Sequence, residues 1–167
     1  GINEFLSDAA TVGIDGLIIV DLPPEEETEL CLPAKKAGID FIYLATPTTD
    51  SRRISKVLKN ASGFVYYVSI AGITGTKSAG IDEIKSAVSN LRKNTNLPIG
   101  VGFGITTPRQ ASEIAKIADA VVVGSALVNI VRDNLDKIGK AGPNLIGEVL
   151  SLVNDLSVGV KNNRKIK

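Results

Sequence analysis

The chain has 167 residues, enough for one domain with a proper core, and we predict a single domain over residues 1–167. Its 19 basic and 18 acidic residues give a net charge of +1, so charge does not favour a nucleic-acid partner. No apolar stretch reaches the ~18 residues of a membrane helix. The absence of histidine removes the commonest metal ligand, so we expect no metal site.

Short apolar runs rich in β-branched residues alternate along the chain with helical patterns. The opening "GINEFL" predicts the first turn of a helix. Continuous apolar runs predict strands buried on both faces, at 16–23, 41–47, 64–69, 97–104 and 120–125. Helical patterns lie between them, at 25–38, 50–62, 80–94 and 107–118. A repeating strand–helix unit predicts parallel strands joined by right-handed crossovers.

Residues at the helix ends support this division of the chain. Gly13, Gly38 and Gly63 each precede a strand and are predicted to end a helix. Thr107 followed by Pro108 predicts a helix start, because proline is favoured at the first helical position.

Two architectures share this pattern of elements. A five-stranded doubly wound domain fits the length, whereas an eight-stranded barrel needs ~250 residues, of which this chain would hold five strands. The segments 100–105 ("GVGFGI") and 121–126 ("VVVGSA") end the last two strands with glycines and a helix start. Exposed backbone amides and a helix N-terminus form a phosphate site without Lys or Arg. Barrels place such a site after their last strands, so the sequence favours the barrel.

The other strand ends are less specific. Asp21 could be a catalytic acid, but a capping or turn role explains it better, and residues 45–50 are mostly turn-forming. Tyr66 and Tyr67 are predicted to point to opposite faces, and the inward one either binds a substrate or packs in the core. The glycine-rich loop at 70–80 predicts a mobile lid.

Five segments resemble, in order and over essentially the whole chain, the α subunit of tryptophan synthase: "DGLIIVDLPPEE", "FIYLATPTT", "GFVYYVSIAGITG", "LPIGVGFGI" and "ADAVVVGSALV". The resemblance implies an α/β fold of the (βα)8 TIM-barrel family, with this chain covering roughly strands 4 to 8. It implies a lyase of tryptophan biosynthesis that cleaves indole-3-glycerol phosphate, by a retro-aldol reaction, to indole and glyceraldehyde 3-phosphate.

The same resemblance implies partners and location. The family works as an α2β2 heterotetramer with a β subunit, which alone carries pyridoxal phosphate, so no cofactor is expected on this chain. The segments are similar to those of bacterial members, which implies the cytoplasm.

The family's site residues carry over to matching positions of this chain. Those implied to bind the substrate phosphate are Gly75, Gly104, Gly124 and Ser125, the last also through its hydroxyl. Phe103, Ile18 and Leu44 are implied to line the indole pocket. Tyr66 matches an active-site tyrosine with a supporting catalytic role, and Thr74 matches a threonine of the closing loop.

The family's essential glutamate and its partner aspartate lie at positions that precede Gly1, so we expect this chain to lack the acid–base pair. The isolated 167 residues are therefore expected to be inactive. One alternative is a non-catalytic phosphate-binding or assembly fragment. Another is a different phosphate-binding TIM-barrel enzyme, such as indole-glycerol-phosphate synthase or a phosphoribosyl isomerase, which would supply more charged strand ends than Asp21.

Overall fold

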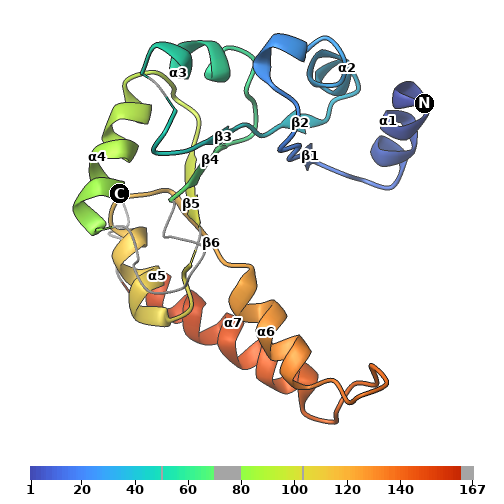
Figure 1. The fold of residues 1–167 in the computed structure, drawn as a ribbon, viewed down its shortest axis with the longest axis vertical. Helices are drawn as coiled ribbons and strands as arrows, with labels where there is room; N and C mark the ends of the chain where they lie inside the picture. Colours follow the sequence, from blue (N-terminus) through green and yellow to red (C-terminus); the bar gives the residue numbers. More distant parts are fainter. Residues whose placement is uncertain (50, 70–79, 103, 163–167) are drawn as a thin grey trace. The chain divides into compact units, whose positions relative to one another are not determined.

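The computed structural model of the chain describes residues 1–49, 51–69, 80–102 and 104–162 (Figure 1). It divides into two compact units, the first made of Gly1–Val68 and Ser86–Gly100 and the second of Ser69–Lys85 and Val101–Lys167. Helix α4 (Ile81–Arg92) and strand β5 (Ile99–Gly102) each contribute to both units. A single domain over 1–167 stays a prediction.

The first unit begins with a helix, as predicted. Its helical elements are α1 (Ile2–Thr11), the 3₁₀ turn η1 (Pro24–Glu26), α2 (Cys31–Lys36) and α3 (Ser51–Leu58). Its strands are β1 (Gly16–Leu17), β2 (Asp40–Phe41), β3 (Leu44–Ala45) and β4 (Val65–Val68), followed by the start of β5.

Strand pairing in the first unit is parallel, as predicted. Strand β1 pairs with β2 through Leu17 and Phe41, and β3 pairs with β4 with Leu44 opposite Tyr66. The N–H of Val65 donates to the carbonyl of Pro98 at 2.9 Å, which joins β4 to the chain that enters β5. The largest fully buried side chains of this unit, which form its core, are Phe41, Ile39, Ile99, Val65, Val88 and Cys31.

Two predicted strands are shorter than their apolar runs. The predicted strand 16–23 ends at Leu17, and the predicted strand 41–47 is two short strands, β2 and β3. The reason is the availability of partners: β2 pairs with β1, which stops at Leu17, whereas β3 pairs with β4, which starts at Val65. Residues 42–43 separate the strand that pairs with β1 from the strand that pairs with β4.

The predicted helix 25–38 is also wrong in extent, since only η1 and the six-residue α2 are helical. Pro33 lacks an N–H, so it fits only in the first turn of a helix, where no intrahelical acceptor is needed. Gly13 (φ +81°) and Gly38 (φ +78°) follow α1 and α2 as predicted. Gly63 (φ +71°) does not end a helix, because α3 stops at Leu58 and Gly63 lies in a loop against Asp40.

In the second unit β5 is a neighbour of β6 (Ala120–Val122). The helices that follow are α5 (Pro108–Ala115), α6 (Ser125–Asp133) and α7 (Leu145–Lys161). The predicted start of α5 is confirmed: the N–H of Gln110 donates to Thr107 Oγ1 at 3.3 Å, and Gln110 Oε1 accepts from the N–H of Thr107 at 3.1 Å. The 17-residue α7 was not predicted.

Helix α7 turns back along α6 and packs against α5 (Figure 1). The contact with α5 is unusually close at Gly159, where an added Cβ would lie 2.5 Å from the carbonyl oxygen of Pro108. Leu156 of α7 and Ala111 and Ile114 of α5 are buried in the same unit. A residue without a side chain therefore allows α7 to approach the first turn of α5.

We predict that Gly159→Ala destabilises the protein by about 1–3 kcal/mol, because the new methyl group must displace the backbone of α5. Gly147→Ala is the matched control in the same helix, since no atom lies within 4 Å of its added Cβ. The control should be neutral or stabilise by up to about 1 kcal/mol through helix propensity. Urea unfolding measures both, and a Gly159 variant as stable as the control would contradict the packing argument.

Candidate functional site

Three of the residues predicted to bind phosphate lie in the second unit, at the ends of β5 and β6. Gly104 follows β5, is exposed and has φ +70°, a conformation that favours glycine. Gly124 follows β6 and is the N-cap of α6, and Ser125 is the first residue of that helix. Both residues are exposed, so a ligand can reach their backbone amides.

The N-terminus of α6 has the properties of an anion site. The first backbone bonds of the helix run from the N–H groups of Leu127 and Val128 to the carbonyl of Gly124, at 2.9 and 3.1 Å. The N–H groups of Ser125 and Ala126 come before these bonds and have no intrahelical acceptor. Among the residues that the structure describes, no side chain caps the helix, and a Cβ at Gly124 would meet no atom within 4 Å. Open space therefore faces amides at the positive end of the helix dipole.

Ser69 fixes the carboxyl end of β5 in the same unit. Its N–H and its Oγ both donate to the carbonyl of Gly102, at 3.1 and 3.2 Å, and its side chain is only 3% exposed. These bonds hold Gly102, which lies two positions before Gly104. Ser69 was not among the predicted site residues, although a small polar residue directly after an apolar run was a signal for it.

In the first unit, Leu44 and Tyr66 are direct neighbours on adjacent parallel strands. Both are half-buried, whereas the next pair in the register, Ala45 and Tyr67, is buried. The alternation agrees with the prediction that Tyr66 and Tyr67 point to opposite faces of the sheet. Ile18 follows β1 with 45% of its surface exposed. The structure thus brings Leu44 and Tyr66 together on the less buried face.

Burial raises the pKa of Tyr66 above its usual value near 10. Burial, and to a smaller extent the neighbouring Cys31, raises the pKa of Tyr43 further, and no group among the described residues other than this thiol is a candidate partner for its Oη. The neighbouring Cys31 donates from Sγ to the carbonyl of Asn60 at 3.8 Å, and burial raises the pKa of this thiol too. Tyr43 therefore belongs to the core rather than to a site.

The acidic residues after β1 are at the surface. Glu25 pairs with Lys56 at 3.0 Å and with Arg53 at 3.6 Å, and the hydrogen bond from Lys56 lowers the pKa of the Glu25 carboxyl. This pairing keeps the Glu25 carboxyl ionised. It gives Glu25 a structural role at the surface, so no catalytic role is needed to explain the residue. Asp21 is exposed in the turn before η1, and its predicted role in the turn stays a prediction.

The remaining predicted residues, Thr74, Gly75 and Phe103, lie outside the residues that the structure describes, as does most of the predicted lid. Their roles stay predictions. Within the described ranges, no group of three or more His, Cys, Asp or Glu side chains could hold a metal ion. No helix among those residues is long and apolar enough to cross a membrane.

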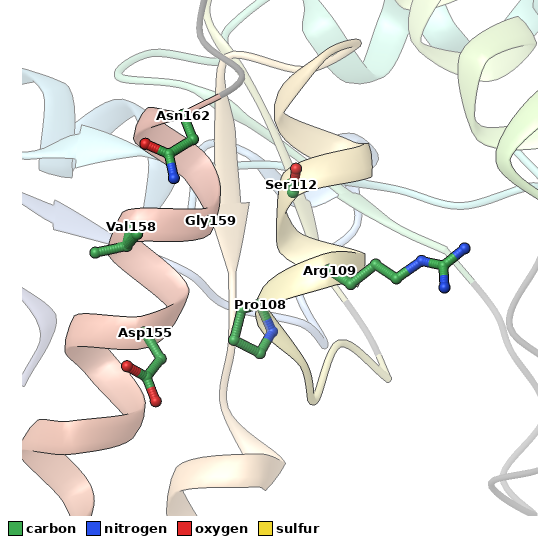
Figure 2. Close-up of a pocket in the computed structure, with 7 residues that line it drawn as sticks. All are labelled: Pro108, Arg109, Ser112, Asp155, Val158, Gly159 and Asn162. Atoms are coloured by element: carbon green, nitrogen blue, oxygen red, sulfur yellow. The ribbon is translucent and has the colours of Figure 1, made fainter.

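Two open grooves occur away from these residues. One, of about 440 Å³, lies in the second unit between α5 and α7 and is lined by Pro108, Arg109, Ser112, Asp155, Val158, Gly159 and Asn162. Figure 2 shows Arg109 pointing away from α7, and its Nε lies 3.5 Å from Glu113. The other, of about 380 Å³, lies in the first unit between α1 and α2. Neither groove is lined by a predicted site residue.

The model of the tryptophan synthase alpha chain family matches residues 1–150 of this chain. The tryptophan synthase subunit alpha of Legionella pneumophila is 33% identical with a TM-score of 0.82, over 97% of this chain and 58% of that one. A structure from Aquifex aeolicus VF5 is 36% identical with a TM-score of 0.78, over 95% and 56%. The tryptophan synthase of Mycobacterium tuberculosis, in an open form with BRD0059 bound, is 28% identical with a TM-score of 0.80, over 96% and 56%.

The chain thus spans less than three-fifths of these solved chains. The predicted fold class, α/β of the (βα)8 TIM-barrel family, is confirmed for the part of a barrel that this chain represents.

We predict that Tyr43→Phe leaves the protein as stable at pH 7 or more stable by up to about 1 kcal/mol, because the buried hydroxyl that it removes has only the thiol of Cys31, a weak hydrogen-bonding group, as a polar neighbour. The raised pKa of Tyr43 means that the unfolded chain loses this proton first as the pH rises past about 10, so stability falls with pH there. The variant should lose less stability than the parent over that range.

Tyr66→Phe is the control, since its hydroxyl is on a half-buried side chain. Urea unfolding between pH 8 and 11 measures both variants. If Tyr43→Phe destabilises the protein clearly at pH 7, the hydroxyl has a partner and the argument is wrong.

Proposed function

Because the chain belongs to the tryptophan synthase alpha chain family, we propose that it supplies the phosphate-binding part of a lyase that converts indole-3-glycerol phosphate to indole and glyceraldehyde 3-phosphate. The observation that carries this proposal is the exposed, uncapped N-terminus of α6 at Gly124. Amides at such a helix end bind a phosphate dianion through hydrogen bonds and through the helix dipole.

The proposed phosphate ligands are backbone groups. Ser125 donates from its N–H and its hydroxyl, and the amides of Gly124 and Gly104 complete the part of the site that belongs to the second unit. Gly75 is proposed as a further donor. The exposure of Gly124 and Ser125 and the left-handed conformation of Gly104 support this assignment, since a side chain at Gly104 would strain the backbone that presents its amide.

Three of the residues proposed to contact the indole ring or act beside it, Leu44, Ile18 and Tyr66, belong to the first unit. Leu44 and Ile18 supply apolar surface, together with Phe103, and Tyr66 supports catalysis beside them. The register that places Leu44 beside Tyr66 supports this grouping. Thr74 is proposed to act in a loop that closes over the substrate.

Cleavage needs a group that protonates indole C3, one that removes the indole N–H proton and one that takes a glycerol hydroxyl proton. No residue of 1–167 is proposed for these steps, so these residues alone are proposed to bind without catalysis. The proposed partner is a tryptophan synthase β subunit in an α2β2 complex that carries the pyridoxal phosphate. This chain is proposed to need no cofactor and to work in the cytoplasm.

The test is Ser125→Asp in the protein that carries these residues, with indole-3-glycerol phosphate binding measured by calorimetry. A carboxylate at the phosphate position should weaken binding at least tenfold by charge repulsion. The same carboxylate in the first turn of α6 should stabilise the fold by about 0.3–1 kcal/mol, so weak binding would not reflect unfolding.

Asn154→Asp, on the exposed side of α7, adds the same charge elsewhere in the second unit and should leave binding unchanged. Equal affinities for the Ser125 and Asn154 variants would refute the phosphate site at α6.

A second expectation concerns catalysis by residues 1–167 alone. We expect this polypeptide, mixed with indole-3-glycerol phosphate, to release no indole above the uncatalysed rate, because no acid–base residue is assigned to it. The absorbance or fluorescence of released indole measures the reaction. Measurable turnover would show that these residues contain a proton donor and acceptor that the proposal lacks.

A further inference from the structure

Three threonine side chains converge directly after β3. Thr46 Oγ1 lies 2.9 Å from Thr48 Oγ1 and 3.2 Å from Thr49 Oγ1. Thr46 and Thr49 are half-buried, and Thr48 is exposed. We call these three hydroxyls the threonine cluster.

Part of the threonine cluster has a structural role. The N–H of Thr46 donates to Thr49 Oγ1 at 2.9 Å, and the N–H of Thr49 donates to the carbonyl of Thr46 at 2.9 Å. These two bonds close the turn that leads to α3. The hydroxyl of Thr48 takes part in neither of these backbone bonds; it contacts Thr46 Oγ1 and is otherwise exposed.

The cluster has one hydroxyl proton to spare. Three hydroxyls provide three donors, and the two contacts that Thr46 makes with its neighbours use two of them. Whichever way the hydroxyls rotate, one O–H remains to donate outside the cluster, while oxygen lone pairs remain to accept. Such a group suits a ligand hydroxyl, which is both a donor and an acceptor, better than a charged group.

The position of the cluster indicates which part of a ligand it would meet. Side chains alternate along β3, so Thr46 falls on the same face as Leu44 and one step nearer the carboxyl end of the strand. Leu44 is paired with Tyr66 on that face. Ligands of α/β sheets bind at the carboxyl ends of the strands, which is where the cluster lies.

We propose that the threonine cluster binds the hydroxyl groups of the side chain of a ligand whose ring lies against Leu44 and Tyr66. This inference rests on the proposed function. It adds that Thr48 hydrogen-bonds the hydroxyl groups of the substrate's glycerol chain, and that Thr46 holds the Thr48 hydroxyl in position. Thr49 positions the turn and does not contact the ligand.

The test compares two ligands in the protein that carries these residues: indole-3-glycerol phosphate and 3-(indol-3-yl)propyl phosphate. The two share ring, chain length and phosphate, and only the first has side-chain hydroxyls. Thr48→Val removes one hydroxyl at constant shape and keeps both bonds of the turn. It should weaken binding of the glycerol compound about three- to tenfold, the effect of one neutral hydrogen bond, and leave the propyl compound unchanged.

Thr46→Val is the second variant and should act in the same direction, because it removes the centre of the cluster. Thr11→Val is the control: its hydroxyl bonds the carbonyl of Ser7 at 2.8 Å on the exposed side of α1, and it should change neither affinity. Calorimetry gives the affinities, and thermal unfolding shows whether each variant is folded.

The outcomes separate the two proposals. If the parent binds both compounds and Thr48→Val and Thr46→Val leave their ratio unchanged, the threonine cluster is only a turn and this inference is wrong, while the proposed function stands. Equal weakening of both compounds also overturns it, because the hydroxyl contribution is then not selective. If the parent binds neither compound, the proposed function fails and this inference fails with it.

Discussion

The parallel pairing of short strands is the constraint on which the other features depend. A parallel strand must be followed by a crossover, so the chain leaves each sheet at the carboxyl end of every strand. In the first unit this places the threonine cluster after β3. In the second unit it places Gly104 after β5 and Gly124 with Ser125 after β6. The residues proposed to bind a ligand are therefore loop residues held by the strands that precede them.

The chemistry at these strand ends comes from the backbone more than from charged side chains. A chain with no histidine and a net charge of +1 has no obvious cationic site for a phosphate. The proposed phosphate site at the N-terminus of α6 needs none, because backbone amides at a helix N-terminus and the helix dipole attract an anion. Ser69 serves the same end indirectly, since its two bonds to Gly102 hold the last residue of β5. Of the two glycines, Gly104 has the left-handed conformation that favours glycine, and Gly124 is exposed at the N-cap of α6.

Local features of the fold could be predicted from the sequence, and features that depend on partners could not. The capping of α5 by Thr107 and the glycines after α1 and α2 follow from local chemistry and are confirmed. The lengths of β1, β2 and β3 depend on which strands face them, so the apolar runs 16–23 and 41–47 overestimated them. Pro33 was a visible signal that the helix 25–38 would be short, and it was not used.

The candidate site also has a part that local sequence predicts and a part that depends on distant partners. The glycines and Ser125 could be assigned from the sequence because a phosphate site of backbone amides has a recognisable pattern. The bond of Ser69 has no such pattern, since its partner Gly102 lies 33 residues away, whereas Thr46 and Thr48 are two residues apart in one turn. Contacts from backbone amides and contacts from side-chain hydroxyls also differ in how a mutation can test them. A backbone amide cannot be deleted by changing a side chain, so its role shows only when a charge or bulk is added against it, whereas a hydroxyl can be removed at constant shape. The proposed phosphate site and the threonine cluster can therefore be tested independently.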